Sequence, residues 1–146
     1  MPSVNLRISQ QGPLLDAKIG VSATRREAMQ QAGEDVPEWV CVRLLIDTGT
    51  HFTCLDPWII ERLQLRPSGL VDIHTPSTNA HNAHSCQQYD ISLMIPHPNI
   101  NRIFGAVCAI ESNLRHQGID GLLGRDLLSQ CLFIYNGELN TYTLSF

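Results

Sequence analysis

The chain has 146 residues, of which 43% are hydrophobic and 16% are charged, and its formal net charge at pH 7 is −4. This length is enough for one ordinary hydrophobic core and too short for a protein built from two full lobes. The acidic balance, with no cluster of Lys and Arg beyond Arg25-Arg26, argues against nucleic acid or an anionic membrane surface as a partner.

No stretch of the sequence reaches the roughly 18 consecutive apolar residues that a membrane helix needs. Residues 1–7 also lack the apolar region of a signal peptide, so we expect a soluble, cytoplasmic protein.

The five cysteines are an odd number and show no Cys-x-x-Cys spacing, which indicates free thiols rather than a disulfide framework or a zinc ribbon. Cys41, Cys108 and Cys131 lie in apolar runs, where cysteine usually packs as a small core residue. Cys54, seven residues after Asp47, stays a candidate for a reactive thiol.

The first half of the chain predicts strands interrupted by one polar excursion. Residues 4–9 and 14–21 flank a Gly-Pro turn and predict a first hairpin. Residues 22–37 are polar and contain Thr24-x-x-Glu27, a capping box that predicts a short helix ending near Gly33. An apolar strand follows over residues 38–46.

The second half continues this pattern. Asp56 as N-cap with Pro57 at the first helical position predicts a helix over residues 57–64. Period-two alternation predicts a hairpin from residues 70–75 and 89–95, and a further strand over residues 103–110. Residues 132–146 predict a last hairpin, in which Asn136-Gly137 would supply a type I′ turn.

The motif that carries chemistry is Asp47-Thr48-Gly49-Thr50, directly after the apolar strand. An acid at the point where a buried strand breaks into a Gly-containing turn is held on a stiff element and is presented at a surface. Alone, Asp-Thr-Gly is a weak signal, because such turns are common. The signal becomes more specific because Leu122-Leu123-Gly124 and a short helix follow about seventy residues later.

This order of motifs resembles the retropepsin-like aspartic proteases over roughly residues 36–146. The resemblance implies an all-β, retropepsin-like closed barrel with one or two short helices. We expect residues 1–146 to form a single domain of this kind, with the polar excursion at 22–37. A single Asp-Thr-Gly implies a homodimer in which each copy supplies one Asp47.

The resemblance also implies the roles of the other site residues. Two Asp47 carboxyls would share one proton and activate a water against a protein or peptide substrate, without a cofactor or metal. The expected support of the active-site loop is Thr48, Gly49, Leu122, Leu123 and Gly124. The expected substrate-binding residues are Thr50 and His51 beside the motif, and Thr75, Pro76, Ser77 and Thr78 at the tip of a hairpin flap.

Two points about the site residues stay open at this level. Viral members pair the Arg of the Gly-Arg segment with an Asp that is absent here, so Asp56 and Asp126 are the guesses for the partner of Arg125. Asp120 and Asp126 are rival catalytic acids, although a turn and a helix start explain them more simply.

Two other functions also stay open. The same fold could be a dimeric peptide-binding module without turnover. A weaker option is a redox or metal sensor that uses Cys86 with His81 and His84 of the flap.

Overall fold

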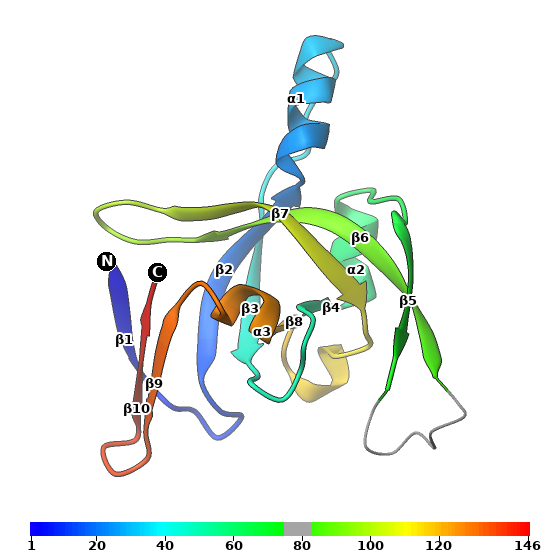
Figure 1. Cartoon of the computed structure of the whole chain (residues 1–146). Coiled ribbons are helices and arrows are strands. Elements are labelled where there is room, and N and C mark those ends of the chain that lie inside the picture. Colours follow the sequence, from blue (N-terminus) through cyan, green and yellow to red (C-terminus); the bar gives the residue numbers. More distant parts are fainter. Residues whose placement is uncertain (75–82) are drawn as a thin grey trace.

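A computed structural model describes residues 1–74 and 83–146 of the chain (Figure 1). Within these residues the strands are β1 (Ser3–Arg7), β2 (Leu14–Val21), β3 (Val40–Ile46), β4 (Cys54–Leu55), β5 (Gly69–Ile73), β6 (His84–Ile95), β7 (Arg102–Glu111), β8 (Gly121–Leu123), β9 (Leu132–Asn136) and β10 (Thr141–Ser145). The helices are α1 (Ala23–Gln31), α2 (Pro57–Arg62), α3 (Arg125–Leu128) and the short 3-10 helix η1 (Arg115–Gln117).

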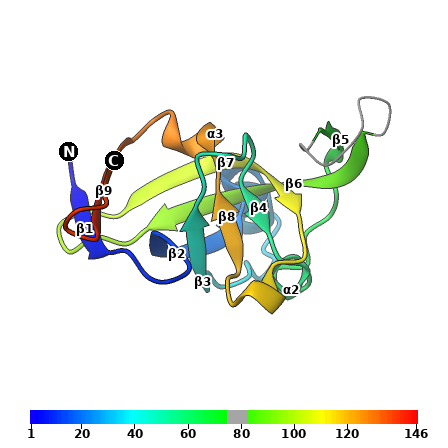
Figure 2. The same ribbon diagram turned by 90° about the horizontal axis from the view of Figure 1, so that it is seen from below.

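Six strands close into a barrel. The larger sheet has the order β2-β3-β8-β4-β7-β6-β5, and an additional pairing of β2 with β6 closes the ring and leaves β5 outside it. A separate sheet with the order β1-β10-β9 stands at one end of the barrel, with β5 and β6 at the other (Figures 1 and 2). The all-β closed barrel predicted from the sequence is therefore confirmed.

The core of the barrel comes from the alternating apolar positions of its strands. The main cluster includes Leu44 on β3, Leu93 on β6 and Leu123 on β8, each at most 1% exposed, and α2 adds the fully buried Ile59. Cys41 and Cys108 are exposed, so the prediction that they are core residues is wrong. Both occupy strand positions that face outward, and a run of apolar letters does not tell the two faces of a strand apart.

The predicted first hairpin is wrong. β1 pairs with β10, with Val4 opposite Leu144, and β2 pairs instead with β3 and β6. Only an isolated bridge between Ser9 and Gly12 joins the two segments directly. Alternation and a turn signal identify strands, but the hydrophobic faces that must be covered decide which strands pair.

The last hairpin is confirmed, but its turn differs from the prediction. Asn136 is paired with Thr141, so residues 137–140 form the connection, and the positive φ lies at Asn140. The side chain of Asn136 accepts a hydrogen bond from the Leu139 N–H at 3.0 Å. A four-residue loop therefore replaces the two-residue type I′ turn.

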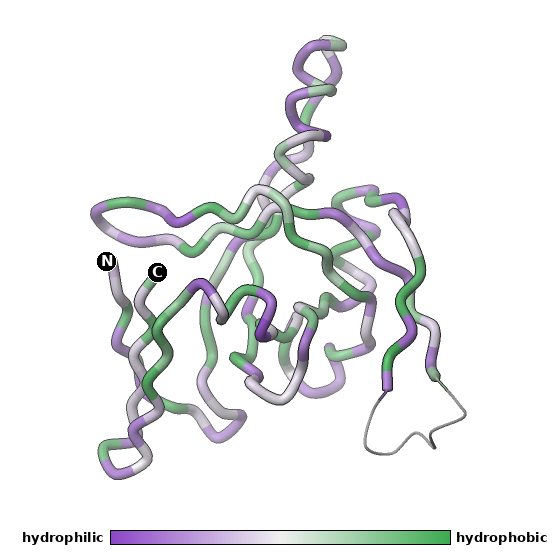
Figure 3. Tube along the Cα trace, viewed as in Figure 1, coloured by the Kyte–Doolittle hydropathy of each residue, from purple (hydrophilic) through white to green (hydrophobic). Residues whose placement is uncertain are grey.

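Helix α1 stands off the barrel and is mostly hydrophilic (Figures 1 and 3). Its N-cap is Ser22, whose hydroxyl accepts from the Arg25 N–H at 3.2 Å, so the capping box predicted at Thr24 is wrong. None of its residues is fully buried. None of the helices in the described residues is long and apolar enough to cross a membrane.

Asp56 ties α2 to the segment before η1. It is 6% exposed, and its carboxylate accepts from the N–H groups of Trp58 (3.2 Å), Leu114 (2.9 Å) and Arg115 (2.8 Å). Burial raises the pKa of this carboxyl, but the three donors outweigh burial and hold its pKa below its ordinary value of 3.8.

We predict that Asp56→Asn lowers the free energy of unfolding at pH 7 by about 1–3 kcal/mol, because an amide cannot accept all three bonds. Since the folded-state pKa is depressed, the ionised group stabilises the fold above about pH 4, and this stability is lost as the pH falls through the folded pKa. The gap between variant and wild type in urea unfolding should therefore shrink towards pH 3.

The control is Asp35→Asn, which removes an exposed carboxylate from the loop after α1 and should change little at either pH. Equal stability of Asp56→Asn and wild type at pH 7 would contradict the assignment.

Candidate active site

Asp47 follows β3 at the edge of the barrel where a second strand also ends. β3 pairs in parallel with β8, with Ile46 opposite Leu123, and the Asp47 N–H donates to the Leu123 carbonyl at 3.1 Å. Because parallel strands end at the same edge, Asp47 and Gly124 leave the barrel side by side. The Asp47-Thr48-Gly49 turn and the Leu122-Leu123-Gly124 segment therefore lie next to each other.

The turn after β3 orients the Asp47 carboxylate. Oδ1 accepts from the Gly49 N–H at 2.8 Å, and the Thr50 N–H lies 3.4 Å from the Asp47 carbonyl. A Cβ on Gly49 would lie 3.0 Å from Oδ1. Asp47 is half-buried, and no described residue donates a hydrogen bond to Oδ2. One oxygen is thus fixed by the backbone and the other remains open to a reactant.

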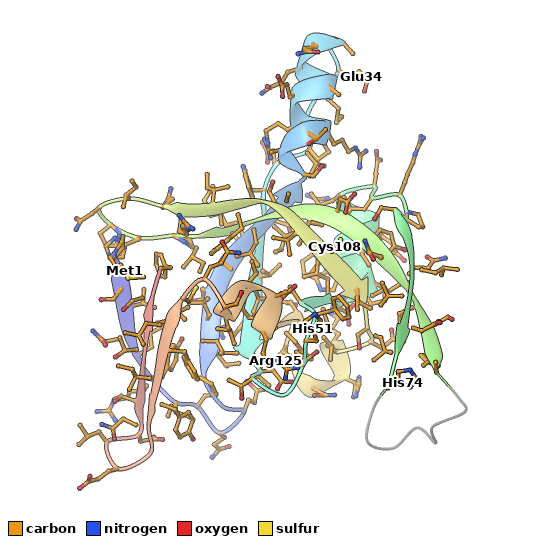
Figure 4. The ribbon with its side chains drawn as sticks, in the orientation of Figure 1. Met1, Glu34, His51, His74, Cys108 and Arg125 are labelled. Carbon is orange, nitrogen blue, oxygen red and sulfur yellow. The ribbon has the colours of Figure 1, made fainter. Side chains whose placement is uncertain are left out.

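The start of α3 holds the residues after this turn. The N–H groups of Arg125 and Asp126 donate to the carbonyls of Thr50 and His51, both at 3.0 Å. The Arg125 guanidinium donates to the Thr48 carbonyl at 2.8 Å, and His51 and Arg125 lie close together in Figure 4. The described contacts of Arg125 include neither Asp56 nor Asp126, so both guesses for its partner are wrong.

Asp126 has a structural role that the sequence did not indicate. Its carboxylate accepts from the N–H (3.0 Å) and the hydroxyl (2.9 Å) of Thr53, a fully buried residue at the end of the same loop. The Thr53 hydroxyl in turn accepts from the Gly124 N–H at 3.3 Å. A Thr just before a strand and an Asp in the first turn of a helix are both common in sequences. Only the tertiary structure shows that Thr53 and Asp126 bond to each other.

Gly124 is required because the two loops touch through their backbones. A Cβ at this position would lie 2.5 Å from the Phe52 carbonyl carbon and 2.9 Å from the Thr53 nitrogen. These are main-chain atoms, which cannot rotate away as a flexible side chain can. The glycine of Leu122-Leu123-Gly124 therefore allows the close approach of the second loop to the first.

Asp120 is also a structural acid. Its Oδ2 accepts from the Arg43 N–H at 2.8 Å, and its Oδ1 accepts from the Trp58 indole at 3.2 Å. Both of its oxygens hold the fold together, as do those of Asp126. Neither rival acid is available to a reactant in the way that Asp47 is.

Thr50 and His51 lie beside Asp47 as the sequence suggested. Thr50 is half-buried and its hydroxyl donates to the Phe52 carbonyl at 3.1 Å. His51 is exposed and meets the Phe52 ring edge-on, with centroids 4.6 Å apart. Phe52 was not predicted as a site residue, because nothing in the sequence showed that its ring would stand here.

An apolar surface extends from the site towards the hairpin of β5 and β6. It covers a small second core of Cys54, Ile110, Leu114 and Ile119, and its partly buried members include Leu45, Phe52, Val71, Ile73, Cys86 and Leu122. The predicted flap residues Thr75, Pro76, Ser77 and Thr78 lie outside the described residues, and their roles stay predictions. β5 pairs with residues 84–88 of β6, with Ile73 opposite His84, so a hairpin is present at this place. The predicted second arm is wrong, because residues 89–95 pair with β7 and β2 instead.

The cysteines near the site are poorly suited to nucleophilic chemistry. Cys54 is 8% exposed, and burial raises the pKa of its thiol to about 11, so it is protonated at neutral pH. His84 and Cys86 both lie on β6, whereas His81 falls outside the described residues. The described residues contain no group of three or more His, Cys, Asp or Glu side chains that could hold a metal ion.

Comparison with known proteins places this geometry in a known fold. No family model matches the sequence, and a search of curated proteins finds no match. Among solved structures, a retropepsin-like aspartic protease from Rickettsia conorii aligns over 99% of this chain and 90% of its own, with a TM-score of 0.58 and 14% sequence identity. This chain has the retropepsin-like fold.

A second solved structure is more distant. The retroviral protease-like domain of Ddi1 from Leishmania major aligns over 88% of this chain and 86% of its own, with a TM-score of 0.40 and 12% identity. The likeness to the Rickettsia conorii protease, at 14% identity, shows the fold alone, and the activity is argued from the site.

We predict that Gly124→Ala lowers the free energy of unfolding by about 2–3 kcal/mol, because the added Cβ forces the two loops apart. Hydrogen exchange at the Asp47 and Arg125 amides should also become faster. The control is Gly69→Ala, where no atom lies within 4 Å of the added Cβ and φ is ordinary. Unchanged stability and exchange in Gly124→Ala would show that the two loops are not coupled there.

Proposed function

We propose that the protein is an aspartic endopeptidase in which two Asp47 carboxyls, one from each copy of a homodimer, activate a water against a peptide bond. The observation that carries this proposal is the environment of Asp47. Its carboxylate is half-buried on a stiff strand end, one oxygen is fixed by the Gly49 N–H, and no described residue donates to the other.

The chemistry follows from placing two such carboxyls close together. Two neighbouring carboxylates cannot both ionise cheaply, so the pair keeps one proton and titrates as a unit. The ionised member takes a proton from a bound water as that water attacks the carbonyl carbon. The protonated member donates a hydrogen bond to the carbonyl oxygen, which stabilises the tetrahedral intermediate.

A second copy is the source of the second carboxyl in this proposal. Asp120 and Asp126 are each occupied by main-chain or side-chain donors, so neither is suited to complete the pair within one chain. The exposed Thr48 lies next to Asp47 and, by family analogy, would contact its mate across the two-fold axis.

The arrangement of the elements supports a dimer on the face that carries Asp47. The loop after β3, the turn between β9 and β10, and the ends of β5 and β6 at Ile73 and His84 all lie towards the same side, the lower side in Figure 1 (Figures 1 and 2). Strands β1 and β9 and the turn between β9 and β10 also bear large exposed apolar side chains: Leu6, Leu132, Ile134, Tyr135 and Leu139. Leu6 and Tyr135 lie on one face of this sheet and Leu132 and Ile134 on the other, so each face offers exposed apolar side chains to a partner.

We predict that Asp47→Asn abolishes peptide cleavage while the fold and dimer persist, because an amide is nearly isosteric but cannot carry the shared proton. The thermal midpoint at neutral pH should stay level or rise, since two acidic groups that disfavour each other's ionisation are removed from one site. Wild type and variant should be incubated with a diverse peptide library from acidic to neutral pH.

The matched control is Asp16→Asn, which removes an exposed carboxylate that is paired with Arg43. Cleavage by Asp47→Asn at the wild-type rate would reduce Asp47 to a turn residue. Peptide binding without cleavage by the wild type would instead favour the silent peptide-binding module.

We predict that the active species is a symmetric dimer. Replacing Tyr135 and Leu139 together with Lys should shift sedimentation towards the monomer and lower cleavage in parallel, because charge is placed on the proposed interface. Ile100→Lys, on an exposed apolar residue of the loop between β6 and β7, is the control and should change neither. Full wild-type activity far below the concentration at which dimer forms would overturn the prediction.

A further inference from the structure

The outer face of β2 and β3 brings an amine and a thiol together, those of Lys18 and Cys41. The two residues are directly opposite in the antiparallel register, which places their Cβ atoms roughly 4.5–5.5 Å apart. The neighbouring pair, Ala17 and Val42, is buried in the barrel, so the alternation of the strands points Lys18 and Cys41 outward. Cys41 is exposed, and Lys18 is the only lysine of the chain.

A cavity of about 580 Å³ lies over this pair, and its lining includes Asp16, Lys18, Cys41, Arg43, Pro96 and Gly118. Pro96 follows β6 and Gly118 follows η1, so segments far apart in the sequence build its walls. Its volume is in the range of pockets that hold small molecules. On its other side Cys41 borders a smaller hollow of about 360 Å³, where Arg62 adds a cation and Glu38 an acid. Because Cys41 is exposed, a small molecule in the larger cavity can reach its sulfur.

Lys18 supplies a positive charge that the surrounding acids do not neutralise. Asp16 is already paired with Arg43, with 3.0 Å between Oδ1 and Nε. Asp120, which also lines the cavity, accepts from the Arg43 N–H and from the Trp58 indole. No carboxylate among the described residues lies within ion-pair distance of Lys18. Its ammonium is therefore left to attract an anion beside the thiol.

The other cysteines are less suited to react with an anion. Burial raises the pKa of four thiols, those of Cys54, Cys86, Cys108 and Cys131. Cys108 is exposed like Cys41, but its Sγ lies 3.5 Å from Asp90 Oδ1, and this carboxylate raises the pKa of the thiol further. The chain thus has two exposed thiols, one opposite an ammonium and the other beside a carboxylate.

We propose that Cys41 is a modification site that forms a mixed disulfide with a small disulfide carrying carboxylates. The Lys18 ammonium attracts a carboxylate and so holds the small disulfide over the Cys41 sulfur. The Cys41 thiolate attacks one sulfur of that disulfide, the S–S bond breaks, and the departing thiolate takes up the proton that Cys41 lost. The small disulfide is the oxidant, since one half stays on Cys41 and the other half leaves as a thiol. The inference does not depend on the proposed peptidase activity.

The test is the rate at which the reduced full chain reacts with glutathione disulfide at neutral pH. Remaining thiols are alkylated at each time point, and peptide mass spectrometry gives the modified fraction at every cysteine. We expect Cys41 to react at least about tenfold faster than Cys108, because a charged site raises the local concentration of an oppositely charged reactant. Cystamine, a disulfide that carries amines in place of carboxylates, should lose this preference for Cys41.

The decisive variants change the charge opposite Cys41. Lys18→Gln should slow the reaction of Cys41 with glutathione disulfide by about threefold or more, because the attraction of the carboxylate is lost. Lys18→Arg keeps the charge and should keep the wild-type rate, which separates this effect from a folding defect. The matched control is Arg66→Gln, which removes an exposed cation of the loop after α2, outside the lining of the cavity, and should change nothing.

The Cys41→Ser variant should lose the fast reaction and keep the slow one at Cys108. The proposal is overturned if Cys108 reacts with glutathione disulfide as fast as Cys41, or if Lys18→Gln reacts as fast as wild type. It is also overturned if cystamine shows the same preference for Cys41 as glutathione disulfide.

Discussion

The parallel pairing of β3 with β8 is the constraint on which the candidate active site depends. It brings Asp47 and Gly124 to one edge of the barrel, although more than half of the chain separates them. The missing side chain of Gly124 then lets the two loops touch, and the bonds between Thr53 and Asp126 hold them together. Because Leu123 lies on β8 and Asp126 lies in α3, the loop that carries Asp47 is anchored to stiff elements.

The Asp residues of this region differ in how many hydrogen bonds each carboxylate already accepts. Asp56, Asp120 and Asp126 each accept at least two hydrogen bonds, spread over both oxygens, from groups that hold the fold together. Asp47 accepts one hydrogen bond, from the Gly49 N–H to Oδ1, and its Oδ2 has no donor among the described residues. A carboxylate that is fully satisfied by the scaffold has little capacity left to orient a water, so this difference separates structural acids from the proposed reactive one.

Strand β3 runs between two opposite sides of the barrel, since Asp47 follows its last residue and Trp39 precedes its first. The side of the barrel with Asp47 also carries the turn between β9 and β10, whereas the opposite side carries the mostly hydrophilic helix α1 (Figures 1 and 3). A dimer formed on the first face would leave the second accessible. The polar excursion between β2 and β3 thus adds a separate surface to the barrel.

Residue types within a few positions of one another are enough to predict the local features of this protein. The turn at Asp47, the cap of α2 by Asp56, and the strands around residues 89–95 all follow from residue types within a few positions. Tertiary structure decided the rest: the pairing of β1 with β10, the hydrogen bond from Arg125 to Thr48, and the buried pair of Thr53 and Asp126. An alternating strand can pair with any free edge and a side chain can bond any group within reach, so these outcomes depend on which distant segments the barrel brings together.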